Sequence, residues 1–417
     1  MSDPAEIVIV DGSRTPFCKM GSDLAAMDAV GLGAAAVKAL MARVGVSHEG
    51  VDEVIFGCVC QPFDAANIAR VIALRSGFPD STPAFTVQRN CASGMEAITT
   101  AANKIHAGRG EVFVVGGTES MSHVPFLYRR SAVQKFSALG GARSFGKKLQ
   151  AMLRFRPRDF SPVIGLKLGL ADPVAGMGMG ETAELLAREF DISRAEQDAF
   201  ANRSQHRAAE AQQKLAEEIS PVFPEGVKHA ATRDNGVRDD SSTDKLAKLR
   251  PAFDRKYGTV TAGNSSQISD GAVALLVTTA GRASKEGWQV LGTLIDHAFT
   301  GCDPKRMGLG PVTAIQQLHQ RTGAAPKDCE VVEINEAFAA QVLAVQKALA
   351  GAGLEVSDEQ LNPNGGAVAL GHPVGATGAR LVLTVLNELK RRGGGQGIAS
   401  LCVGGGQGGA VLLRHRP

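Results

Sequence analysis

The side chain best suited to act as a nucleophile in this chain is Cys91, which follows an extended run and precedes an apolar helical pattern. Unsatisfied N–H groups and the macrodipole at the start of a helix favour a thiolate over a thiol. We therefore expect the pKa of Cys91 to lie below the value of about 8.5 of a free cysteine. The alternative is a small buried cysteine that caps a packed helix.

A general base for this nucleophile is available near the other end of the chain. His372 lies in the glycine-rich turn 370–378, ahead of a long helix predicted over 380–392. A histidine between glycine and proline is held by backbone geometry, which suits a catalytic base. The alternative is a turn histidine exposed to solvent.

A second cysteine and a run of glycines follow the buried-strand pattern at 398–403. Cys402 stands where the pattern breaks, and Gly404 begins the glycine run. Glycine lets a backbone N–H group approach a ligand closely. The run lacks the Gly-Lys-Ser/Thr ending of a phosphate-binding loop, so its spacing does not predict a nucleotide site of that kind.

A fourth polar position follows a predicted strand at 331–334. This strand leads into Asn335 and Glu336 at the start of a helix. Buried pairs of this kind are usually structural, so by itself this one indicates no chemistry.

The elements that must position these residues alternate between strands and helices. Met95, Ile98, Ala102 and Ile105 have the spacing of one apolar helical face, which predicts a helix that stops near Ala107-Gly108. Strands rich in Val and Ile lie between such helices, which predicts mainly parallel sheets covered by helices.

Two strand patterns of the first half recur in the second. Residues 52–57 are similar to 328–333, and residues 112–117 are similar to 401–405. Each half carries one of the two main catalytic candidates at a helix start. The pattern indicates a duplicated unit.

Taken in this order, the segments around the four candidate positions resemble the thiolase family. The resemblance runs from residues 8–17 to the last strand and includes 181–184 and 258–266. It implies an α/β fold, a five-layered α-β-α-β-α sandwich of two duplicated halves with an inserted lid domain. The implied domains are an N-terminal half of 1–120 plus 251–280, a lid of 121–250 and a C-terminal half of 281–417.

The resemblance also implies the chemistry, which is CoA-dependent cleavage of a 3-ketoacyl-CoA to acetyl-CoA and a shortened acyl-CoA in fatty-acid β-oxidation. His372 takes the proton of Cys91, and the thiolate attacks the 3-keto carbon. Cys402 serves first as an acid and then as a base. Backbone N–H groups of Cys91 and Gly404 form one oxyanion site, and His372 with a water held by Asn335 forms the other.

Coenzyme A is implied as a co-substrate, and we expect no permanently bound cofactor and no metal. The family pattern places Arg238 near the nucleotide end of CoA. It places five further residues along the pantetheine arm: Met179, Phe253, Ala262, Ser266 and Phe338. Gly178 stands where some family members have histidine.

Three alternatives to degradative cleavage remain open. A biosynthetic acetoacetyl-CoA thiolase would use the same residues to condense two acetyl-CoA molecules. A ketoacyl-synthase-like condensing enzyme shares the fold and the cysteine nucleophile, but it has no need of Cys402. A non-catalytic CoA-binding protein would not need to keep Cys91, His372 and Cys402 together.

Composition indicates the compartment of the protein and the kinds of partner that it binds. A net charge of +3 over 417 residues argues against nucleic acid as a partner. Seven cysteines without zinc-site spacing predict reduced thiols. The N-terminus lacks a basic leader, and no apolar stretch reaches the length of a membrane span, so we expect a cytoplasmic protein. The family habit is a homodimer or homotetramer.

One segment is strongly basic. Residues 129–158 hold nine basic side chains and no acid before Asp159, and Phe145, Leu149, Met152 and Leu153 share one helical face. Such a helix can rest on a membrane, bind a partner subunit or guide a polyanionic ligand. It can also pack on its own domain. Its position resembles an insert in the thiolase subunit of the β-oxidation multienzyme complex.

Overall fold

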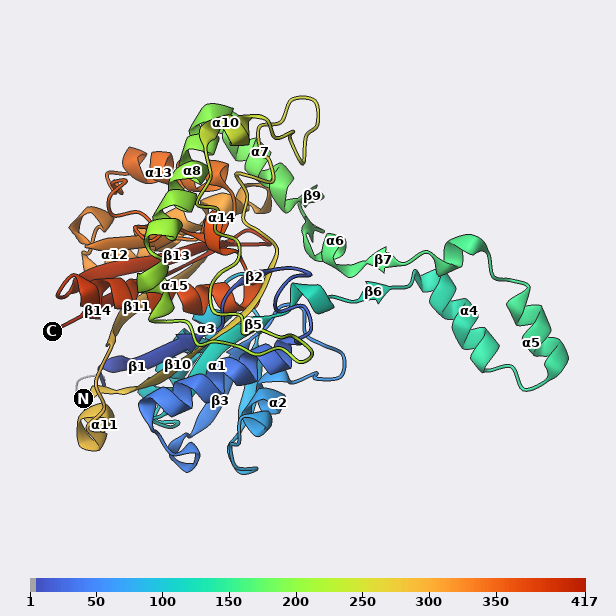
Figure 1. Cartoon of the computed structure of the whole chain (residues 1–417), viewed down its shortest axis with the longest axis horizontal. Coiled ribbons are helices and arrows are strands. Elements are labelled where there is room, and N and C mark those ends of the chain that lie inside the picture. The colour runs from blue at the N-terminus through green and yellow to red at the C-terminus, as the bar shows by residue number, and fades with distance from the viewer. Residues whose placement is uncertain (1–4) are drawn as a thin grey trace. The chain divides into compact units, whose positions relative to one another are not determined.

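The computed structural model describes residues 5–417, and their contacts divide the chain into two compact units. The larger unit comprises the chain up to His123 and Asp172–Pro417, and the smaller unit is Val124–Ala171. Figure 1 labels the elements along the chain.

The helices are α1 (Ala29–Val44), α2 (Ile68–Arg75), α3 (Ser93–His106), α4 (Arg130–Gly140), α5 (Phe145–Met152), α6 (Gly165–Gly169), α7 (Met179–Glu189), α8 (Arg194–Glu210), α9 (Gln212–Ala216), α10 (Thr243–Ala247), α11 (Ala280–Glu286), α12 (Gly310–Thr322), α13 (Ala339–Gly351), α14 (Ala367–Leu370) and α15 (Val374–Arg391). The strands are β1 (Ile7–Arg14), β2 (Cys18–Lys19), β3 (Glu53–Gly57), β4 (Ala84–Val87), β5 (Phe113–Glu119), β6 (Phe126–Leu127), β7 (Val163–Ile164), β8 (Ala171–Asp172), β9 (Met177–Gly178), β10 (Ser269–Thr279), β11 (Gly292–Gly301), β12 (Val331–Ile334), β13 (Gly395–Val403) and β14 (Gln407–His415).

The main sheet of the larger unit consists of two similar halves joined in its middle. Its strand order is β12-β13-β14-β11-β1-β10-β5-β3-β4, with β2 paired to β10. The two halves meet where β1 pairs antiparallel with β11. On one side β5 follows α3 in the chain and pairs with β10, and on the other side β13 follows α15 and pairs with β14. This order agrees with the duplication predicted from the recurring strand patterns.

The prediction of mainly parallel sheets is wrong. Only β3 with β4, β3 with β5 and β12 with β13 are parallel among the strand pairs of the main sheet that the structure describes. The others are antiparallel, because each half ends in strands that return alongside its first strand. Strands buried on both faces read as continuous apolar runs, which sequence alone attributes to parallel pairing.

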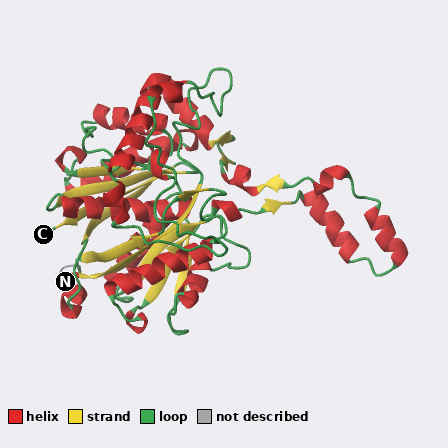
Figure 2. Ribbon diagram, in the orientation of Figure 1, coloured by secondary structure: helices red, strands yellow, loops and turns green. Residues whose placement is uncertain are grey.

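Three helical layers cover and separate the two halves of the sheet, as Figure 2 shows for helices and strands. α1 and α2 pack on the outer face of one half, and α12 and α13 pack on the outer face of the other. α3 and α15 lie between the halves and share one apolar core with strands of both. The layers therefore have the predicted α-β-α-β-α order.

The two central helices approach each other closely at their starts. A Cβ on Gly94 would lie 2.9 Å from the carbonyl oxygen of Gly375, and a Cβ on Gly378 would lie 2.6 Å from the backbone nitrogen of Met95. Glycine is therefore required at these positions for helix-to-helix contact. The predicted helix near 95–105 is confirmed as α3, whereas α15 begins earlier than predicted, because its glycines serve packing and not a turn.

The smaller unit contains a two-stranded ribbon of β6 and β7 together with α4 and α5. Aromatic rings of Tyr128, Phe136, Phe155 and Phe160 form its contacts, with centroid separations of 4.9 to 6.2 Å. Residues 172–250 share the larger unit with both halves. The division into 1–120 with 251–280, 121–250 and 281–417 stays a prediction. Within residues 5–417, none of the helices has both the length and the apolar content that a membrane span requires.

Candidate active site

Cys91 lies in a tight turn between β4 and α3. The hydroxyl of Ser93 donates to the carbonyl of Asn90 at 2.7 Å and accepts from the backbone N–H of Arg89 at 2.9 Å. Asn90 has a φ of 42°, in the left-handed region that asparagine tolerates better than most residues. The turn thereby holds the cysteine two residues ahead of the first helical residue, Ser93.

The expectation of a lowered pKa for Cys91 is wrong for the resting structure. Burial raises the pKa of this thiol to about 11, although the backbone N–H groups of Gly404 and of Cys91 itself act in the opposite direction. The nearby carboxylate of Glu119 adds to the rise. Desolvation of the thiolate outweighs the helix start. Cys91 is therefore a thiol at neutral pH, and it needs a base to become nucleophilic.

Gly404 reaches Cys91 from the opposite half of the sheet. The side-chain amide of Asn90 donates a 2.7 Å hydrogen bond to the carbonyl of Gly404. The N–H of Gly404 favours the thiolate of Cys91 and so acts to lower the pKa of that thiol, as a donor close to the sulfur does. Two N–H groups, from Gly404 and from Cys91, thus converge on one position.

Cys402 lies two residues earlier, near the end of β13, and is buried. Burial raises the pKa of its thiol, and the charge of an ionised Cys91 raises it further. The two thiols are therefore close enough to influence each other. The structure brings together three of the predicted site residues, Cys91, Cys402 and Gly404.

His372 is buried in the turn ahead of α15. Its backbone N–H donates to the carbonyl of Gln267 at 3.1 Å, and its Nδ1 lies 2.7 Å from Oγ1 of Thr377. The Thr377 hydroxyl donates to the carbonyl of Pro373 at 2.9 Å, so its oxygen is left to accept from Nδ1–H. This assignment leaves Nε2 with a free lone pair, as a base requires.

The imidazole of His372 is neutral at physiological pH. Burial, together with the positive charge of Arg380, lowers its pKa to about 4. A neutral ring can take a proton from a thiol.

Asn335 sits at the end of β12, where its backbone N–H donates to Ser400 at 2.9 Å. Its side chain is fully buried, and neither Nδ2 nor Oδ1 has a hydrogen-bond partner among residues 5–417. Buried amides are seldom left unpaired. The side chain is therefore suited to hold a water molecule or a substrate oxygen.

Glu336, the neighbour of Asn335, organises the loop that leads to His372. Its carboxylate accepts from Ser204 Oγ at 2.6 Å, Asn362 Nδ2 at 2.8 Å and the Val368 N–H at 3.1 Å. Glu336 is therefore a structural anchor, as the usual behaviour of such pairs suggests.

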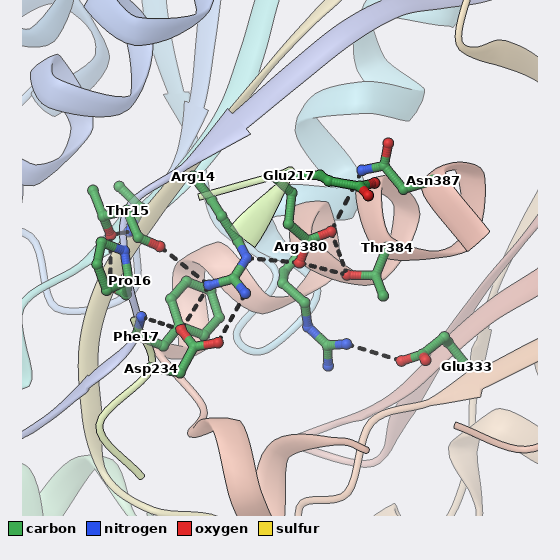
Figure 3. A network of polar contacts seen from close by, with 12 residues as sticks. Arg14, Thr15, Pro16, Phe17, Glu217, Asp234, Glu333, Arg380, Thr384 and Asn387 are labelled. Carbon is green, nitrogen blue, oxygen red and sulfur yellow. Dashed lines mark hydrogen bonds and ion pairs between the residues drawn. The ribbon is translucent and has the colours of Figure 1, made fainter. Parts of the chain in front are cut away.

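Buried ion pairs connect the elements that carry these residues, as Figure 3 shows. Arg380 of α15 pairs with Glu333 of β12 at 2.8 Å, which fastens the helix after His372 to the strand before Asn335. Arg14 pairs with Glu218 and Asp234, both at 2.7 Å. Removing one partner of such a pair leaves an uncompensated buried charge, at a cost of about 3–5 kcal/mol.

Four of the five residues predicted along the pantetheine arm lie near these groups. Met179 and Phe338 share an apolar cluster with Cys402, and a Cβ on Gly404 would lie 3.6 Å from Sδ of Met179. The ring of Phe253 meets that of Phe338 edge-on at 5.8 Å. The backbone N–H of Ser266 donates to the carbonyl of Ala337, which precedes Phe338 in the chain.

Arg238 and Ala262 line a separate pocket of about 230 Å³, together with Lys245 and Gln267. Lys245 is already paired with Asp240, which lines the same pocket, so Arg238 is the cation left there for a phosphate-bearing ligand. Gln267 also binds the backbone of His372, so this pocket adjoins the turn of the base.

Three site residues were missed in the sequence analysis: Asn90, Thr377 and Glu119. Asn90 directly precedes Cys91, and Thr377 follows His372 by five residues, so a search for a hydroxyl shortly after the histidine would have found Thr377. Glu119 accepts from the N–H groups of Val59, Cys60 and Gly375 at 2.9 to 3.1 Å. Burial raises its pKa to about 7. No local pattern in the sequence indicates this role.

Comparisons with known proteins agree with this geometry. Residues 7–281 match the family model of the thiolase N-terminal domain, and residues 288–415 match that of the thiolase C-terminal domain. The chain is 40% identical to a 3-ketoacyl-CoA thiolase of Yersinia pestis (strain Pestoides F) over 422 aligned positions, which cover 98% of this chain and 96% of that protein.

Solved structures show the same architecture. An acetyl-CoA acetyltransferase of Bacillus anthracis has a TM-score of 0.89 at 37% identity and covers 98% of both chains. Human mitochondrial 3-ketoacyl-CoA thiolase in complex with CoA has a TM-score of 0.88 at 36% identity, covering 99% of this chain and 98% of that one. The chain belongs to the thiolase family, and it is an acyltransferase.

Proposed function

We propose that this protein cleaves 3-ketoacyl-CoA with CoA, giving acetyl-CoA and an acyl-CoA shortened by two carbons, in fatty-acid β-oxidation. The observation that supports this most strongly is the proximity of two buried thiols, Cys91 and Cys402, since an ionised Cys91 acts on the pKa of Cys402, together with the N–H group of Gly404 beside Cys91. The 40% identity with a 3-ketoacyl-CoA thiolase over nearly the whole chain favours the degradative direction.

In the first half-reaction, Nε2 of His372 takes the proton of Cys91 and the thiolate attacks the 3-keto carbon. The bond between the α- and β-carbons breaks, and the acyl group stays on Cys91 as a thioester. The electron pair goes to the α-carbon of the leaving acetyl-CoA enolate. Cys402 donates its proton to that carbon.

In the second half-reaction, the Cys402 thiolate takes the proton of a CoA thiol. The CoA sulfur attacks the acyl group on Cys91, and the shortened acyl-CoA leaves. The Cys91 thiolate then regains the proton held by His372. Cys402 therefore ends each cycle as a thiol, which agrees with its raised pKa.

Two oxygens gain negative charge in this cycle, and donors are available for both. The N–H groups of Cys91 and Gly404 would stabilise the oxygen of the acyl group. His372 and a water held by the unpaired amide of Asn335 would stabilise the thioester oxygen of the enolate.

CoA would lie with its pantetheine arm along Met179, Phe338 and Phe253, and with its nucleotide end at Arg238. The positions of Ala262 and Ser266 near these residues support the same path. One solved structure of human mitochondrial 3-ketoacyl-CoA thiolase is that of its complex with CoA. CoA acts here as a co-substrate.

A biosynthetic acetoacetyl-CoA thiolase is the second candidate, because the Bacillus anthracis structure with a TM-score of 0.89 is an acetyl-CoA acetyltransferase. CoA-dependent cleavage of acetoacetyl-CoA and 3-ketohexadecanoyl-CoA, measured for the wild type and Cys91→Ala, separates the two. Cleavage of both, lost in the variant, supports the degradative enzyme. Cleavage of acetoacetyl-CoA alone supports the biosynthetic one. No cleavage of either substrate by the wild type would refute both.

We also infer a cytoplasmic homodimer or homotetramer, from the bacterial thiolases among its relatives and from the family habit. The basic segment 129–158 would bind outside its own unit, either to a β-oxidation partner subunit or to a membrane surface. Size measurement of the purified protein tests the first point.

A further inference from the structure

The smaller unit, residues 124–171, exposes an unusual amount of apolar surface. It holds eleven of the 21 large apolar side chains that are exposed among residues 5–417, although it contains 48 residues. Four of them form the apolar face of α5: Phe145 is 82% exposed, Leu153 78%, Met152 58% and Leu149 49%. Within the smaller unit, this face is therefore not packed against other residues.

The exposure of this face follows from how α5 packs. The aromatic contacts of the smaller unit use Tyr128, Phe136 of α4 and two rings that follow α5 in the chain, and no ring of α5 itself. α5 itself buries Ala151, which lies about 150° around the helix from the centre of the apolar face. A small residue is turned inward, and the large apolar side chains are turned to solvent.

The two units also differ in their balance of basic and acidic residues. The smaller unit carries ten basic residues and one acid, whereas the rest of the chain carries 35 basic and 41 acidic residues. The single acid, Asp159, is already paired with Lys135 at 2.6 Å. The other nine cations are exposed and form no ion pair with residues 5–417.

We infer that α5 and its basic neighbours are a docking surface for an anionic phospholipid bilayer. The apolar face has the amphipathic order of an interfacial helix, with Lys147 and Arg154 on the opposite side and Lys148 at its border. An excess of nine positive charges fits a negatively charged headgroup layer. The inference deepens the proposed binding role of segment 129–158, and it does not depend on the catalytic steps.

The partner chemistry follows from the combination of these features. A protein partner ordinarily supplies carboxylates at fixed positions that match the cations it binds. The exposed cations here are spread around a small unit, an arrangement that a continuous layer of anionic headgroups can bind without such a match. A bilayer accepts side chains such as Phe145 and Leu153 to a shallow depth while lysine and arginine side chains extend to the headgroups. Attraction of this kind weakens as salt is added.

The test is flotation of the purified full-length protein with two kinds of vesicle, phosphatidylcholine alone and phosphatidylcholine mixed with phosphatidylglycerol. We expect flotation with the mixed vesicles only, and less of it at high salt. Two triple variants should lose it: Phe145→Ser/Leu149→Ser/Leu153→Ser and Lys147→Glu/Lys148→Glu/Arg154→Glu. Charge reversal should weaken partitioning by more than about tenfold, since each cation near an anionic surface contributes about fivefold.

Matched variants in the larger unit control for general loss of charge or apolar surface. These are Phe223→Ser/Val227→Ser/Val290→Ser and Lys214→Glu/Lys228→Glu/Lys285→Glu. They should float as the wild type does. All four variants should cleave acetoacetyl-CoA in solution at the wild-type rate, which separates loss of docking from loss of folding or of the proposed catalysis.

A second variant measures insertion directly. With Trp288→Phe and Leu153→Trp combined, the single tryptophan should be quenched by brominated lipid chains in mixed vesicles. Failure of the wild type to float with anionic vesicles, or equal flotation of the charge-reversed variant, would overturn the inference. Stable association with a purified protein in the absence of any flotation would overturn it in favour of a protein partner.

Discussion

The hydroxyl of Thr377 determines which ring nitrogen of His372 carries the proton. It lies 2.7 Å from Nδ1, and it uses its own hydrogen for the carbonyl of Pro373. A partner that both orients an imidazole and fixes its tautomer commonly contributes one or more orders of magnitude to the rate.

Replacement of Thr377 by valine should therefore lower kcat for thiolysis by about tenfold or more, because Nε2 is no longer held as the free base. Thr377→Ser, which keeps the hydroxyl, should restore most of the activity. Steady-state rates with acetoacetyl-CoA provide the measurement. A wild-type kcat for Thr377→Val would show that the hydrogen bond is dispensable.

The buried state of His372 makes stability depend on pH. Its folded pKa of about 4 lies below its ordinary value of 6.5, so the unfolded chain binds more protons between these values. The contribution of His372 to the free energy of unfolding is fully present above pH 6.5, and it is lost as the pH falls towards 4. Between pH 7 and pH 5 the loss should be about 2 kcal/mol. Urea unfolding of wild type and His372→Gln at both pH values measures it, and equal losses in the two proteins would contradict the assignment.

Because the pKa of Cys91 is raised, we expect its thiol to react slowly with alkylating reagents at neutral pH. Alkylation of Cys91 by iodoacetamide should increase steadily from neutral pH towards about 11, because only the thiolate reacts. Mass spectrometry of the peptide that contains Cys91 follows this residue among the seven cysteines. A plateau already reached near pH 7 would show that the thiolate is the resting form.

Glu119→Gln should have opposite effects on stability and on this reactivity. An amide cannot accept at both ends, so one of the N–H groups of Val59, Cys60 and Gly375 loses its partner, at a cost of about 1–3 kcal/mol. Loss of the negative charge lowers the pKa of Cys91, so alkylation at pH 8 should become faster. Glu111→Gln, at an exposed site, serves as the control. Unchanged alkylation would show that Glu119 acts on Cys91 only through packing.

We expect Asn90 to affect the catalytic rate through the position of Gly404. Asn90→Gly keeps the positive φ of the turn but removes the amide that holds the Gly404 carbonyl at 2.7 Å. We expect kcat to fall by about tenfold, since a displaced N–H group loses its stabilisation of the oxyanion. Asn90→Asp should be worse, because a carboxylate repels that carbonyl. Thermal unfolding checks that both variants fold, and an active Asn90→Asp would argue against the role.

The chemistry of the site could be read from the sequence more fully than its electrostatics. Cys91 and Cys402 were found from side-chain type and glycine context, the role of Gly404 was implied by the family resemblance, and the structure brings the three together. The pKa of Cys91 was predicted in the wrong direction, because a helix start is visible in a sequence and desolvation by distant segments is not. Parallel pairing was overestimated for a similar reason, since the order of strands in space depends on contacts far apart in the chain.

The central pair of helices has a consequence for how the site is assembled. α3 comes from one half and α15 from the other, and in separate polypeptides their starts would meet only by diffusion, at a rate set by protein concentration. The connection that includes α11, between β10 and β11, makes the encounter intramolecular. The effective concentration of one helix start around the other is then independent of how much protein the cell contains.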